Sequence, residues 1–158
     1  MEFDASALRI FNPVPTIIHN LVEIQGLQDF REHLFLIVTE LFTNALDYGL
    51  LSLDSKLKRD SEGMISYFKE REKCLAGLTE GSIQIKCHHN PIGNGGRLIV
   101  QIQDSGPGFR SEDGDANLDN IEESYGRGIT LVKKLCRSLV YTGNGNQVKA
   151  VFEWASDS

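Results

Sequence analysis

The spacing of apolar residues predicts helices in the first half of the chain. Five apolar residues at helical spacing predict a helix over 14–24 that ends at Gly26. A longer run predicts the main helix over 30–48, with Asp29 as its N-cap and Gly49 at its end. The first half is therefore expected to be helical.

Two segments flank these helices. Residues 6–11 predict a short edge strand that stops at Asn12-Pro13. Residues 52–80 are rich in charge, with no glycine between Gly63 and Gly77. Their regularly spaced large apolar residues favour one or two amphipathic helices, because a linker would leave those residues exposed. We expect a helical insertion here.

The period changes to two after residue 81, which predicts strands. The alternating runs cover 82–88, 97–104, 138–142 and 148–154, joined in pairs by glycine-rich turns. A helix is predicted between the pairs, over 128–139. Helices followed by strands indicate the α+β class, here a two-layer sandwich whose mixed, mostly antiparallel sheet carries helices on one face. We expect a single domain over 1–158.

Composition narrows the class of protein. The 41% of hydrophobic residues suffices for one core, and the net charge of −6 argues against nucleic acid or an anionic membrane as partner. The three cysteines form no CxxC pair, which favours a reducing compartment. No apolar run approaches the ~18 residues of a membrane span, and the N-terminal residues do not form a signal peptide. We expect a cytoplasmic protein.

The first candidate motif lies on the long helix. Glu40, Asn44 and Asp47 project within about 60° of one another at helical geometry. Taken alone, this polar stripe is typical of the solvent-exposed face of an ordinary amphipathic helix.

The second motif is Asp104 with Gly106 and Gly108, at the end of a predicted strand. Asp104 ends the apolar face of that strand, where an unpaired carboxylate would cost several kcal/mol. It therefore needs a strong donor, such as the exocyclic amine of a purine, and the glycines would let a flat ring approach the backbone. A plain Gly-Pro turn is the alternative.

The third motif is Gly126-Arg127-Gly128-Ile129, where a polar loop enters a helix. Glycines at the N-terminal end of a helix expose backbone N–H groups that can hold phosphate. The motif is neither a Walker A loop nor a dinucleotide-binding fingerprint. By itself it is weak evidence.

In their order and spacing, the three motifs resemble those of the GHKL ATP-binding domains, also called Bergerat-fold or histidine-kinase-like domains, over about 6–154. The resemblance implies that Asn44 binds the Mg²⁺ that bridges the phosphates of ATP. It implies that Asp104 holds the adenine amine, with Gly106 and Gly108 beside the base. Asp47, Gly126, Arg127, Gly128 and Ile129 complete the implied ATP-binding set, and residues 110–124 would form the ATP lid.

Within that superfamily, Glu40 resembles the glutamate of the anti-sigma-factor serine-protein kinases, where it acts as general base. This implies phosphorylation of a STAS-type anti-sigma-factor antagonist, with a sigma factor as a further partner; whether the domain forms a homodimer stays open. The insertion at 52–80 is longer than in minimal kinases of this type. It resembles the kinase modules fused behind a receiver and a PP2C-type phosphatase.

Tyr48 departs from the pattern, because many of the serine kinases have histidine at this position. One alternative is therefore a non-catalytic module whose nucleotide occupancy gates a partner. Another is the catalytic domain of a two-component histidine kinase. A gyrase-type or MutL-type ATPase is the least favoured, since the chain has no transducer domain.

Overall fold

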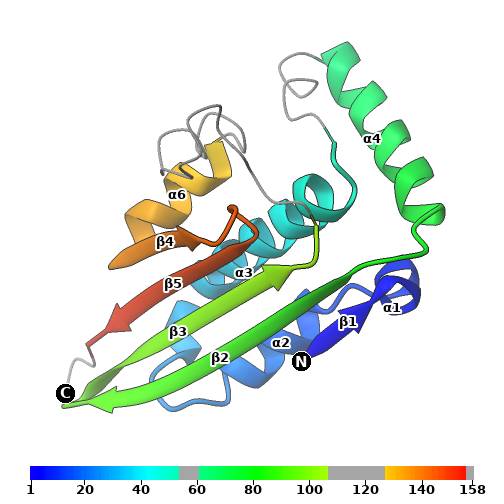
Figure 1. Cartoon of the computed structure of the whole chain (residues 1–158). Helices are drawn as coiled ribbons and strands as arrows, with labels where there is room; N and C mark the ends of the chain where they lie inside the picture. The colour runs from blue at the N-terminus through cyan, green and yellow to red at the C-terminus, as the bar shows by residue number, and fades with distance from the viewer. Residues whose placement is uncertain (54–60, 107–126, 156–158) are drawn as a thin grey trace.

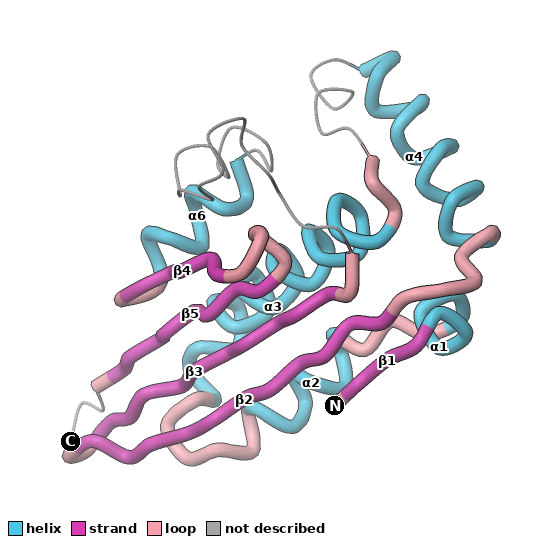
Figure 2. The backbone as a smooth tube through the Cα atoms, viewed as in Figure 1, coloured by secondary structure: helices cyan, strands magenta, loops and turns pink. Residues whose placement is uncertain are grey.

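The computed structural model describes residues 1–53, 61–106 and 127–155. Five antiparallel strands form one sheet in the order β1-β2-β3-β5-β4, and the helices gather on one face of it (Figures 1 and 2). The strands are β1 Glu2–Asp4, β2 Ser82–Ile92, β3 Gly95–Asp104, β4 Ser138–Thr142 and β5 Gln147–Trp154. The helices are α1 Ala5–Ile10, α2 Val14–Leu21, α3 Arg31–Asn44, α4 Ser61–Ala76 and α6 Arg127–Leu135, with a π-helical turn η2 over Ala45–Leu50. The predicted α+β class and one-sided helix layer are confirmed.

The sheet register explains the alternating sequence. In the β2–β3 hairpin, pairing runs from Ile83 opposite Asp104 to Ile92 opposite Gly95. Because side chains alternate between faces, every second residue of β3 points toward the helices and the others point away. The helix-facing residues of β3 are Leu98, Val100, Ile102 and Asp104, all buried. The last member of this buried row is a carboxylate, as the pattern indicated.

Helix α3 fills the space above the centre of the sheet. Its residues Leu34, Ile37, Val38 and Leu41 are at most 1% exposed and form the middle of the core. Phe35, an apolar residue of the same helix, faces away from this core and is 51% exposed. Apolar positions thus occur on both sides of α3.

The prediction of a strand over 6–11 is wrong. The strand is β1, and the residues after it form α1. The side chain of Asp4 accepts a hydrogen bond from the backbone N–H of Ala7 at 2.9 Å, which caps the first turn of this helix. The helix then buries Ala5 and Leu8. Two buried residues three positions apart lie on one face of a helix but on opposite faces of a strand. Their burial together is therefore possible only in a helix.

The predicted limits of the long helix also change. Asp29 lies in a 3₁₀ turn over Gln28–Phe30, and Phe30 occupies the N-cap position without a side-chain hydrogen bond. At the other end the chain does not stop at Gly49 but continues through η2 to Leu50. The backbone N–H of Leu51 donates to the carbonyl of Leu46 at 2.9 Å, the five-residue step that defines π-helix.

The remaining helices agree with the sequence in kind. The insertion contributes α4, while residues 54–60 lie outside the described part of the chain. Helix α6 ends at Leu135, four residues earlier than predicted, because β4 begins at Ser138. Among the described residues, no helix is long and apolar enough to cross a bilayer.

Candidate functional site

Two predicted site residues, Asn44 and Asp104, meet at one narrow cavity. It lies between the end of α3 and the strands β3 and β5, and Leu41, Ile102 and Val148 give it apolar walls. Asn44 and Asp104 are each only 5% exposed. The cavity is only about 10 Å³, roughly the room that one water molecule needs, so it marks where two motif residues converge and is not a formed ligand pocket.

Asp104 is held rigidly at the end of β3. Its backbone N–H donates to the carbonyl of Asn146 at 2.9 Å, and the Asn146 side-chain amide returns a hydrogen bond to its carbonyl at 3.2 Å. Burial raises the pKa of the carboxyl to about 6, although Oδ1 accepts a hydrogen bond from the backbone N–H of Gly106. A carboxylate has room for further donors. Asp104 can therefore accept a hydrogen bond from a ligand amine.

Glycines let η2 lie directly against this carboxylate. A Cβ at Gly49 would come within 2.5 Å of Cγ of Asp104, and a Cβ at Gly106 would overlap the carbonyl oxygen of Gly49. Real Cβ atoms do not make such contacts. Internal packing is therefore one reason why position 106 needs glycine. The sequence motif did not reveal the role of Gly49.

Asn44 carries a buried polar atom that the described residues leave unsatisfied. Its Nδ2 has no hydrogen-bond partner among the described residues, an arrangement that calls for a ligand. The two ends of the amide are interchangeable in such an assignment, so it can offer either a donor to phosphate or an oxygen to a cation. Mg²⁺ takes oxygen ligands and is often held by one or two protein groups plus phosphates. Asn44 fits that role.

Glu40 lies against the start of α6. A Cβ at Gly128 would overlap the carboxylate of Glu40, so only glycine permits this approach. Gly128 is the second residue of α6, where backbone N–H groups lack partners inside the helix. The structure therefore brings the first and third motifs together. Ile129, predicted to contact ATP, is completely buried and anchors α6 in the core.

Asp47 forms two side-chain interactions with α4. Its Oδ2 accepts a hydrogen bond from the hydroxyl of Tyr67 at 2.6 Å, and its Oδ1 pairs with Nε of Arg71 at 2.8 Å. Asp47 is 1% exposed and does not line the Asn44–Asp104 cavity. Its evident role is to fasten α4 to η2. Tyr67 and Arg71 were missed, although their i, i+4 spacing marks one face of a helix.

Other predicted residues fall outside the described part of the chain. These are Gly108, Gly126 and the predicted lid over 110–124. Arg127 is described only as the first residue of α6. No group of three or more His, Cys, Asp or Glu side chains in the described ranges is arranged to hold a metal ion.

Comparison with known proteins identifies a family for this chain. The family model described as histidine kinase-like ATPase domain matches residues 14–152, which include Glu40, Asn44, Asp104 and Gly128. No curated protein and no solved structure gave a significant match.

Proposed function

This chain belongs to the histidine kinase-like ATPase domain family, and we propose that it is an ATP-dependent protein kinase of the anti-sigma-factor serine type. The adenine amine would be held by Asp104, which lies across a narrow cavity from Asn44. The phosphates would extend toward the N-terminal end of α6, where backbone N–H groups favour anions. ATP would then extend from Asp104 of the second motif to Gly128 of the third.

The observation that carries the proposal is the contact between Glu40 and Gly128. It puts a carboxylate beside the backbone expected to hold the transferred phosphoryl group. Glu40 would accept the proton of an incoming serine hydroxyl as that oxygen attacks the γ-phosphorus and ADP leaves. Mg²⁺ held at Asn44 would neutralise charge on the phosphate oxygens. A base so close to the phosphate end suits phosphotransfer better than nucleotide binding alone.

We assign the substrate class from the resemblance carried by Glu40. The substrate would be a serine of a STAS-type anti-sigma-factor antagonist, and its phosphorylation would switch which partner the domain binds, a sigma factor included. The reaction fits the cytoplasm, where ATP is available. Cys74, Cys87 and Cys136, all free thiols, suit that reducing compartment.

The test is phosphotransfer from γ-labelled ATP with Mg²⁺ to a STAS antagonist encoded in the same genome. The expected product is acid-stable label on the antagonist, lost in Glu40→Gln while ATP binding persists. Glu32→Gln, an exposed position on the first turn of the same helix, is the matched control. Acid-labile label would point instead to the histidine-kinase branch. Unchanged transfer by Glu40→Gln would remove Glu40 from the base role.

A further inference from the structure

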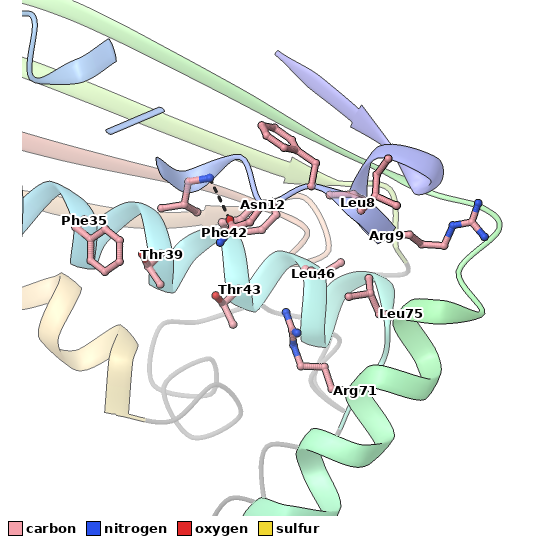
Figure 3. Close-up of a pocket in the computed structure, with 13 residues that line it drawn as sticks. Leu8, Arg9, Asn12, Phe35, Thr39, Phe42, Thr43, Leu46, Arg71 and Leu75 are labelled. Carbon is pink, nitrogen blue, oxygen red and sulfur yellow. Dashed lines mark hydrogen bonds between the residues drawn. The ribbon is translucent and has the colours of Figure 1, made fainter. Parts of the chain in front are cut away.

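A second cavity lies on the helix layer, away from the nucleotide site. It has a volume of about 320 Å³ and is bounded by α1 and the residues after it, by α3, and by α4 (Figure 3). We call it the α1–α3–α4 groove. Among the residues that the structure describes, none lines both this groove and the Asn44–Asp104 cavity. The groove is therefore a different surface from the Asn44–Asp104 cavity.

The groove has an apolar floor and exposed apolar edges. Leu8, Phe42 and Leu46 are buried beneath it. At its edges, Ile10 is 88% exposed, Phe35 is 51% exposed and Phe11 is 45% exposed. Exposed large apolar side chains that surround a hollow are a feature of binding surfaces. Three helices around a hollow would suit an amphipathic segment laid into it.

The charges that line the groove have one sign. Arg9 and Arg71 both line it, while no aspartate or glutamate among the described residues does. The chain as a whole carries −6, so this surface runs against the overall charge. The side chain of Arg71 reaches from α4 toward α3, and Arg9 lies at the α1 edge (Figure 3). Because Arg71 is already paired with Asp47, it is mainly Arg9 that favours an acidic occupant by charge complementarity.

We propose that the α1–α3–α4 groove docks an acidic amphipathic segment of a partner protein. Apolar residues of the segment fill the hollow between Phe11 and Phe35, and carboxylates pair with Arg9 and Arg71. A segment with this pattern supplies both features of the groove at once. Docking of this kind needs neither ATP nor phosphotransfer.

Arg71 gives the docked segment a route to the nucleotide site. The guanidinium that faces the groove also holds the buried carboxylate of Asp47 at 2.8 Å. A partner carboxylate would compete with Asp47 for Arg71. Asp47 lies in η2, the turn that begins directly after Asn44. A change in the Asp47–Arg71 pair would therefore reach the proposed nucleotide site through this turn. This second step rests on the proposed function, while the docking itself does not.

The test uses fluorescence anisotropy of the intact domain without nucleotide. The probe is a labelled helical peptide with leucines at i and i+4 spacing and glutamates on its flanks, compared with the same peptide carrying lysines instead. We expect the acidic peptide to bind at least about ten-fold more tightly. Arg9→Glu and Phe35→Ala should each weaken it by a similar factor. Lys69→Glu, an equal charge change at an exposed position of α4 outside the groove, should not.

Each remaining outcome overturns the proposal. If the two peptides bind equally well, or if neither binds, an acidic segment is not the occupant of the groove. Equal effects of Arg9→Glu and Lys69→Glu would mean that the peptide senses net charge rather than the groove. A dimer in sedimentation that dissociates in Phe35→Ala would assign the groove to a second copy of the chain. None of these results depends on whether the domain is a kinase.

Discussion

Gly49 and Asp104, 55 residues apart in sequence, lie so close together that the π-helical turn η2 rests on the carboxylate that ends the buried face of β3. The contact leaves no room for a side chain at position 49. It joins the residue expected to bind adenine to the turn that follows Asn44. If Asp104 binds adenine as proposed, that binding would depend on the geometry of η2.

Gly49→Ala should disrupt the site without unfolding the domain. The new methyl group would push Asp104 from its position, because the Cβ would lie 2.5 Å from its Cγ. Overpacking of this kind costs about 1–3 kcal/mol, and ATP affinity should fall by at least about ten-fold. Calorimetric titration with ATP and thermal denaturation measure the two effects. Gly77→Ala, where the Cβ would meet only backbone at 3.5 Å, should leave ATP affinity unchanged.

Asp104→Asn should stabilise the nucleotide-free protein at neutral pH. The folded pKa of about 6 lies above the ordinary value of 3.8, so the protonated form is favoured by folding and the ionised form is penalised. The wild type should lose about 2 kcal/mol of unfolding free energy as the pH rises from about 4 through about 6. The asparagine variant lacks this loss. Urea denaturation at pH 4 and pH 7.5 tests it; an equal advantage at both pH values would contradict the assignment.

ATP binding by the wild type should weaken as the pH falls below about 6. The ionised carboxylate accepts a hydrogen bond from an amine better than the protonated carboxyl does. The ATP dissociation constant should rise by up to about ten-fold per pH unit below this pKa. Inorganic triphosphate, which has no adenine, serves as the control ligand. If its affinity follows the same profile, the titrating group lies at the phosphate end instead.

Arg71→Gln should destabilise the domain by leaving Asp47 buried with one partner fewer. Breaking a buried ion pair costs about 3–5 kcal/mol, and because the Arg71 side chain is 28% exposed we expect about 2 kcal/mol. The double variant Asp47→Asn/Arg71→Gln should recover part of this loss, since no buried charge remains. Chemical denaturation measures both. Lys73→Gln, an exposed position on α4, is the matched control.

Gly128→Ala should impair phosphotransfer more than ATP binding. The added methyl group would displace the carboxylate of Glu40, while the adenine contacts at Asp104 are left in place. Single-turnover transfer to the antagonist should fall by at least about ten-fold. Combining the change with Glu40→Gln should add little, because both act on one carboxylate. Additive losses would show that Gly128 matters for another reason.

The parts of the fold that follow a simple period were predictable. The strands could be located because a sheet covered on one face imposes alternation, and Asp104 stood out as a carboxylate on the buried face. The helix α1 was not predictable in this way. Its six residues are too few to show a period, and the decisive interaction is the cap from Asp4.

The roles of Asp47 and Gly49 show a different limit. Asp47 meets Tyr67 and Arg71, which lie 20 and 24 residues further along the chain. Helical spacing placed Asp47 beside Asn44, but spacing cannot reveal which element from elsewhere in the chain arrives there. Gly49 could be interpreted only as a helix stop, since its neighbour Asp104 belongs to a distant strand.

The π-helical turn over Ala45–Leu50 sets the directions in which the side chains that follow Asn44 point. A π-turn accommodates one more residue than an α-turn, so removing a residue here would restore α-helix and rotate the next side chains by about 100°. Asp47 would leave Tyr67, and a side chain would face Asp104 where Gly49 now lies. The number of residues between Asn44 and Gly49 therefore cannot change without moving Asp47 and Gly49 away from their partners. A relative whose helix lacks the extra residue would align correctly up to the asparagine and one position out of phase beyond it.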